Sequence, residues 1–126
     1  MNLINVQRMQ LVWVGLGLAY NAISWWRINL GYAHLSPTDP VTGSVFLAIC
    51  GLVIMAGIKG AHSLYKFTIP LLALLLLYSG VGLHAMAFVS DASFLGYASF
   101  ASWFAAVTIN TYGAITLLAG SWLALG

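Results

Sequence analysis

The stretch TIPLLALLLLYSGVGLHAMAFV, residues 68–89, decides the fold because it is long, apolar and free of charged side chains. A helix that rises about 1.5 Å per residue crosses a hydrocarbon core in about 20 such residues. Further apolar runs lie at residues 9–32, 44–62 and 101–125. These runs are continuous rather than alternating, and they are too few to close a membrane β-barrel. We therefore predict an all-α integral membrane protein with four transmembrane helices in an antiparallel bundle.

The composition also indicates a lipid environment. Of the 126 residues, 62% are hydrophobic and only 5% are charged, against about 25% in an ordinary soluble domain. The charged residues are Arg8, Arg27, Lys59, Lys66, Asp39 and Asp91. So few charges cannot cover a water-exposed surface, which excludes a soluble enzyme. The net charge of +2 is too small and too scattered for a nucleic-acid-binding protein.

The four runs predict a single transmembrane domain over residues 1–126. We expect a polar outer loop at 33–43, a short turn at 63–67 and an interfacial segment at 90–100. Pro70 is expected in the first turn of the third helix, where its missing N–H costs little. The N-terminal segment is expected to be retained as a membrane anchor.

The basic residues predict the orientation. If both termini are cytoplasmic, Arg8, Lys59 and Lys66 lie inside, and Arg27 lies outside with both aspartates. This distribution agrees with the positive-inside rule. We expect the host membrane to be the bacterial inner membrane.

A first group of polar residues is expected near the membrane midplane. Its members are Tyr20, Asn21, Tyr78, Asn110, Thr111 and Tyr112. Asparagine in hydrocarbon needs a partner, and an Asn–Asn or Asn–Tyr hydrogen bond between helices would provide one. We favour such packing contacts. The alternative is a polar site for a small ligand or a path for a neutral solute.

A second group is expected toward the outer face, and it comprises Arg27, His34, Asp39, His84 and Asp91. The favoured interpretation is an ion pair of Arg27 with an aspartate, beside interfacial histidines. The alternative is a set of two histidines and one carboxylate, which is a known ligand type for iron and related metals. His62 is expected apart from this group, at the inner end of the second helix. The cofactor is unknown: haem, pigment or metal could bind through His34, His84 or His62, and bound lipid is expected.

The sequence lacks the features of a catalyst. No carboxylate falls inside a predicted span, and Cys50 is the single cysteine. Small residues recur at helical spacing, which favours close helix packing, in the pairs Ala56 and Gly60, Ala101 and Ala105, and Thr116 and Gly120.

We therefore expect a non-catalytic accessory subunit of a larger membrane complex in energy metabolism, of the electron-transport or membrane-bound oxidase type. Its partners would be membrane lipids and other transmembrane helices, from larger subunits or from copies of itself, and no nucleic acid. One alternative is a homo-oligomeric channel or facilitator for a small solute, with a path lined by Tyr20, Asn21, Asn110 and Tyr112. Another is a haem-, pigment- or metal-binding membrane subunit.

Overall fold

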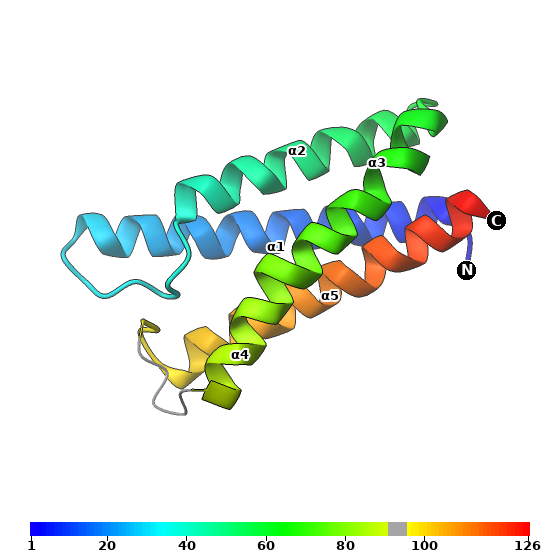
Figure 1. Cartoon of the computed structure of the whole chain (residues 1–126). Coiled ribbons are helices and arrows are strands. Elements are labelled where there is room, and N and C mark those ends of the chain that lie inside the picture. The colour runs from blue at the N-terminus through cyan, green and yellow to red at the C-terminus, as the bar shows by residue number, and fades with distance from the viewer. Residues whose placement is uncertain (91–95) are drawn as a thin grey trace.

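The computed structural model describes residues 1–90 and 96–126, and within these ranges the chain forms helices and no strand. The elements are α1 (Leu3–Asn29), α2 (Pro40–Ile58), α3 (His62–Leu75), the π-helix η1 (Leu76–Gly82), α4 (Leu83–Ser90) and α5 (Phe100–Leu125). α3, η1 and α4 follow one another without a break, so the bundle consists of four antiparallel rods (Figure 1). α1 packs on α2 and α5, and α3 packs on the same two helices.

Within the described ranges, three helical stretches are long and apolar enough to cross a membrane: Pro40–Ile58, His62–Val89 and Phe100–Leu125. This finding confirms the membrane character of the last three predicted runs. Many large hydrophobic side chains lie on the surface of the bundle, and those of Leu52, Leu71 and Ile115 are more than half exposed. An exposed apolar surface of this extent is typical of a protein surrounded by lipid.

α1 is less apolar than the other three rods because polar residues follow its buried side. Val6, Gln10, Trp13, Gly17 and Ser24 are buried at intervals of three, four or seven residues, which is one face of a helix. The opposite face is apolar and exposed, with side chains that include Val12, Leu16 and Ile23. A surface helix of a soluble protein has the reverse arrangement.

The helix ends differ from the predicted boundaries. α1 begins at Leu3, because the side chain of Asn2 accepts a hydrogen bond from the Asn5 amide at 3.0 Å. α2 begins at Pro40, because the Asp39 carboxylate accepts hydrogen bonds from the Thr42 amide at 2.9 Å and from the Thr42 hydroxyl at 2.6 Å. The connection between these helices is therefore residues 30–39, and not the predicted 33–43.

The turn between α2 and α3 also lies earlier than predicted. α2 ends at Ile58, Gly60 has a φ of +113°, and α3 begins at His62. The prediction of a turn at 63–67 is wrong, because these residues are helical. His62 is consequently at the start of α3, and not at the end of α2. Pro70 lies in the helix interior rather than in the first turn, and it cannot donate a hydrogen bond to the carbonyl of Lys66.

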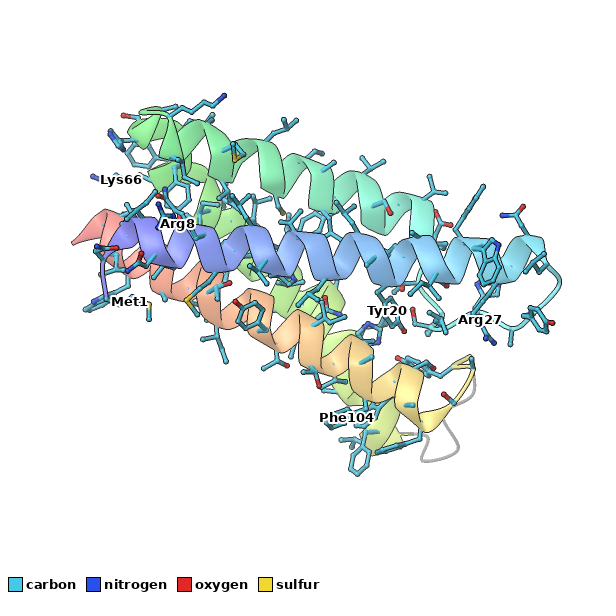
Figure 2. All side chains as sticks on the ribbon, turned by 180° about the vertical axis from the view of Figure 1, so that it is seen from behind. Met1, Arg8, Tyr20, Arg27, Lys66 and Phe104 are labelled. Carbon is cyan, nitrogen blue, oxygen red and sulfur yellow. The ribbon has the colours of Figure 1, made fainter. Side chains whose placement is uncertain are left out.

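The two ends of the bundle carry different groups. Both termini lie at the same end as the α2–α3 turn, which we call the terminal end (Figure 1). Arg8 and Lys66 lie there beside Met1, whereas Arg27 lies at the opposite end, which we call the loop end (Figure 2). The loop end contains residues 30–39 and the start of α5.

The terminal-end half of the bundle is tightly packed around Trp13, which is fully buried. A Cβ atom at Gly113 would lie only 2.2 Å from the indole ring, so α1 and α5 approach closely because Gly113 has no side chain. Next to this contact, the Gln10 amide donates to the Thr116 carbonyl at 2.8 Å and accepts from the Tyr65 hydroxyl at 2.8 Å. These hydrogen bonds connect α1, α3 and α5 near the terminal end.

Candidate functional site: a polar cavity in the loop-end half

The loop-end half of the bundle encloses a cavity of about 430 Å³. Its walls come from α1, α2, the end of α3, η1, α4 and α5, and Ser36, Thr38 and Asp39 of the loop border it. The apolar part of the lining includes Trp13, Phe46, Leu47 and Ile109. The polar side chains of the lining are Tyr20, Asn21, Ser36, Thr38, Asp39, Thr42, Ser79, His84 and Asn110. The cavity thus brings together members of both polar groups that the sequence placed at different depths.

Asn21 and Asn110 enter this site from α1 and α5. Each lies opposite a glycine: a Cβ at Gly43 would be 3.0 Å from the Asn21 Nδ2 atom, and a Cβ at Gly80 would be 3.2 Å from the Asn110 side-chain amide. Within residues 1–90 and 96–126, neither side-chain amide forms a hydrogen bond, and the predicted Asn–Asn or Asn–Tyr bond between helices is not formed. Both amides can therefore bind a molecule in the cavity.

His84 provides a third polar group, from α4. Its side chain is 3% exposed, and its Nδ1 atom lies 2.6 Å from the Tyr97 hydroxyl. Burial raises the pKa of Tyr97, so this phenol is protonated at neutral pH and can donate to Nδ1. When Tyr97 donates, the imidazole proton is on Nε2, which is then a hydrogen-bond donor; in the other tautomer Nδ1 donates to Tyr97 and Nε2 is an acceptor. The Trp103 indole donates to the His84 carbonyl at 2.9 Å and holds α4 against α5.

Hydrogen bonds from α1 hold the loop and the start of α5 in place at the loop-end side of the cavity. The Tyr20 hydroxyl donates to the Ser102 carbonyl at 3.0 Å, and Figure 2 shows Tyr20 pointing from α1 toward α5. The Ser24 hydroxyl accepts from the Leu35 amide at 3.4 Å, and the Ser36 and Thr38 hydroxyls lie 2.8 Å apart. These contacts attach the loop and the start of α5 to α1.

The π-helix η1 decides which residues of the third rod face the cavity. Leu76, Ser79 and Gly80 line the cavity, whereas Tyr78 is 86% exposed on the surface of the bundle. The structure therefore separates Tyr78 from the other midplane residues. π-Helices occur mostly as short insertions in α-helices, frequently at functional sites.

Other predicted site residues lie outside the cavity lining. Thr111 and Tyr112 are partly buried, and Tyr112 packs against the hydrophobic core. Arg27 donates from Nε to the Ala33 carbonyl at 3.4 Å, and its guanidinium lies 5.5 Å from the centre of the Tyr32 ring. Of the two aspartates proposed as partners for Arg27, Asp39 instead accepts its hydrogen bonds from Thr42. Asp91 is outside the described residues.

The predicted metal ligands are also dispersed. His34 and His62 are exposed, and His62 is in the terminal-end half, whereas His84 is buried in the loop-end half. Among the residues that the structure describes, no group of three or more histidine, cysteine, aspartate or glutamate side chains could hold a metal ion.

Comparison with known protein families, with curated proteins and with solved structures gives no match.

Sequence reasoning missed several residues of this region. The cavity lining also includes Trp13, Ser36, Thr38, Thr42 and Ser79. Gln10 and Tyr65 form a hydrogen bond between the cavity and the terminal end. Part of this set follows a readable pattern in α1, where Gln10, Trp13, Gly17, Tyr20 and Ser24 recur on one helical face. A search for a polar stripe in a membrane helix would have found these positions.

The chemistry of the cavity is compatible with a small-molecule binding site. Among the described residues, its polar side chains are hydroxyls, carboxamides, one imidazole and the Asp39 carboxylate, and no lysine or arginine lines it. The Asp39 carboxylate is at the edge, where hydrogen bonds from the Thr42 hydroxyl and amide lower the pKa of Asp39. Mostly apolar walls with a few convergent polar groups are typical of small-molecule sites, and the volume is in the usual range.

Proposed function

We propose that this chain is a non-catalytic membrane protein that binds a small uncharged ligand in its loop-end cavity. The observation that carries the proposal is the pair of amides, Asn21 and Asn110, that have no hydrogen-bond partner among the described residues. A polar group in a low-dielectric site is costly unless it is hydrogen-bonded. Residues selected only for helix packing would be bonded to each other, as Gln10 and Tyr65 are.

The proposal includes α1 as a fourth transmembrane span. The support is the inverted character of this helix, which buries Gln10 and Ser24 and exposes Leu16 and Ile23. A helix of 27 residues is about 40 Å long, which exceeds the thickness of a hydrocarbon core. We also propose that the terminal end is cytoplasmic, because Arg8, Lys59 and Lys66 are near it.

The closed terminal-end half favours binding over conduction. A solute that moved through the bundle would have to pass Trp13, Gln10 and Tyr65, and each of these side chains is at most 1% exposed. The channel hypothesis therefore needs a large rearrangement of a well-packed region, whereas the binding hypothesis needs none.

The second candidate is an accessory subunit of a larger complex, as the sequence suggested. Two small-residue pairs bear on this hypothesis. Thr116 and Gly120 are buried within the bundle, where Gly120 contacts Gln10 and Tyr65, so they are not available to partners. Ala101 is exposed and Ala105 is partly exposed on α5, which favours a partner helix there. A complex in energy metabolism and a bacterial inner membrane are part of this second proposal, and His84 would be the cavity residue for a haem, pigment or metal.

The variant Ala106→Phe tests the binding function. Ala106 is 3% exposed and lines the cavity, so a phenyl ring there would occupy the space of a ligand. Ala101→Phe is the matched control, because Ala101 is on the same helix but exposed. Both variants and the wild type would be released from the producing membrane in polymer nanodiscs and studied by native mass spectrometry.

We expect a small molecule to accompany the wild type and Ala101→Phe, and to be absent from Ala106→Phe. Equal bound mass in all three proteins would overturn the proposal. If Ala106→Phe does not fold, Asn110→Leu provides the same test, because it removes the amide at nearly constant volume. Larger protein chains in the released particles would support the accessory role.

A further inference from the structure

A second hollow lies on the outer surface of the α1–α2 pair, beside the cavity. This groove is lined by Leu18, Ala22, Trp25, Val41, Val45 and Ala48, together with Asn21 and flanking residues of α2. No charged side chain of residues 1–90 and 96–126 lines it. Trp25, Val41 and Val45 are each more than half exposed, so the groove opens outward from the bundle.

Asn21 is the residue that lines both the groove and the cavity. On α1 its side chain is close to Gly43 of α2, since a Cβ at Gly43 would be 3.0 Å from Nδ2. The residues next to this contact divide between the two hollows: Gly17 and Thr42 face the cavity, and Leu18 and Val41 face the groove. One asparagine side chain packed on a glycine therefore separates the polar cavity from the apolar groove.

We propose that the ligand is an uncharged amphiphile, with a compact head in the cavity and a hydrocarbon chain in the groove, and that it passes between α1 and α2 at Asn21. This inference rests on the proposed binding function. The polarity of the two hollows matches the two parts of such a molecule. The chain remains in apolar surroundings during lateral access from the bilayer, so moving it into the groove carries no desolvation cost.

The lining also decides the chemistry of the head. Asn21 and Asn110 offer amide donors and acceptors, and His84 Nε2 offers a donor or an acceptor according to its tautomer, so carbonyl or hydroxyl oxygens are suitable partners. No lysine or arginine lines the cavity to neutralise an anionic head. Asp39 is exposed at the cavity edge and accepts both hydrogen bonds from Thr42 on one oxygen, so its charge lies in contact with solvent rather than among the buried groups that would hold the head. Quinones and monoacylglycerols share the required chemistry.

The test compares compounds that differ in one part. Decylubiquinone and 1-decanoylglycerol have a neutral head and a ten-carbon chain, ubiquinone-0 has the quinone head alone, and decylphosphocholine has the chain with a charged head. Each would be added to the full chain in phosphatidylcholine nanodiscs, and occupancy would be measured by native mass spectrometry at equal mole fraction in the bilayer.

Three variants separate the groove from the cavity. Ala22→Phe fills the groove, and Ala19→Phe is its matched control, because Ala19 is an exposed alanine of α1 that lines neither hollow. Ala106→Phe fills the cavity. We expect Ala22→Phe to lower the affinity for a neutral chain-bearing compound about five-fold, because the phenyl ring occupies part of the groove. Binding of ubiquinone-0, which has no chain, should be unchanged.

The outcomes distinguish the two proposals. If Ala22→Phe behaves like Ala19→Phe while Ala106→Phe abolishes binding, the ligand does not use the groove, and this inference fails although the binding function stands. If Ala106→Phe binds every compound as the wild type does, the binding function itself fails. Decylphosphocholine binding as tightly as the neutral compounds would overturn the neutral head. Whichever of decylubiquinone and 1-decanoylglycerol binds more tightly shows whether the head is a quinone or a glycerol ester.

Discussion

The two halves of this bundle use polar residues in opposite ways. In the terminal-end half, Gln10 is fully buried and both ends of its amide are bonded, to Thr116 and to Tyr65. In the loop-end half, Asn21 and Asn110 lie beside a cavity with no hydrogen-bond partner among the described residues. Gln10 and Asn21 are carboxamides on the same helix. Under the proposed function, an amide is structural where the fold provides its partner and is available for a ligand where the fold does not.

The largest effect is expected where the terminal-end half is most tightly packed. Gly113→Ala places a methyl group 2.2 Å from the Trp13 ring, so α1 and α5 must separate. Overpacking of this kind costs about 1–3 kcal/mol of unfolding free energy. Reversible unfolding in mixed micelles with increasing dodecyl sulfate would measure the loss.

Gly15→Ala is the control for this prediction. A Cβ at Gly15 has no neighbour within 4 Å, and alanine has a higher helix propensity than glycine by about 1 kcal/mol. We expect this variant to be as stable as the wild type or more stable. Equal destabilisation by both changes would show that the Trp13 contact does not limit the distance between α1 and α5.

A smaller loss is expected from the hydrogen bond between Gln10 and Tyr65. Tyr65→Phe leaves the Gln10 acceptor without this donor, and Gln10→Leu leaves the buried Tyr65 hydroxyl without an acceptor. A double-mutant cycle should give a coupling energy of about 0.6 kcal/mol, the average measured for hydrogen bonds inside membranes, and at most about 1.7 kcal/mol. Tyr78→Phe, at an exposed tyrosine, should have no effect. Additive losses in the double mutant would contradict the bond.

The asparagines of the loop-end half should contribute even less to the unfolding free energy. Asn110→Leu breaks no hydrogen bond among the described residues, so we expect its unfolding free energy to change by at most about 0.5 kcal/mol. The same variant should lose the bound ligand. A loss of stability as large as that of Gln10→Leu would instead identify Asn110 as a packing residue and remove the contrast between the two halves.

The smallest effect concerns the cap of α2 and depends on pH. Hydrogen bonds from Thr42 lower the pKa of Asp39 below its usual 3.8, so the cap contributes fully above that pH and is lost as the pH falls through the lowered value. We expect the thermal midpoint of the wild type to decrease more between pH 5 and pH 3 than that of Asp39→Asn, which keeps an uncharged acceptor. Identical pH profiles for the two proteins would exclude Asp39 as the origin of the effect.

Much of the fold could be predicted from hydropathy alone. Three apolar runs are confirmed as helices able to cross a membrane, and the run at 101–125 agrees with α5, Phe100–Leu125, to within one residue. The boundaries before α2 and α3 were less accurate, because they depend on local contacts that hydropathy does not show. The Asp39 cap extends α2 to Pro40, and the left-handed Gly60 allows α3 to begin at His62.

The site was only partly predictable. Asn21, Asn110 and His84 were selected as polar residues in apolar runs, but their depths alone could not show that they share one cavity. The position of Tyr78 depends on η1, because a π-helix changes which side chains face inward and a 3.6-residue period no longer applies. Gln10 and Tyr65 were missed because both are near the predicted ends of helices, where polar residues usually contact water or headgroups.

Under the proposed topology, the Trp13 contact also has a consequence for ion permeability. The cavity is in the loop-end half, and Trp13 and the Gln10–Tyr65 hydrogen bond lie between it and the terminal end. One indole ring held against Gly113 blocks the path between the cavity and the terminal end. If the bundle spans the membrane as proposed, we expect a side chain at position 113 that displaced this ring to increase ion leak across the bilayer.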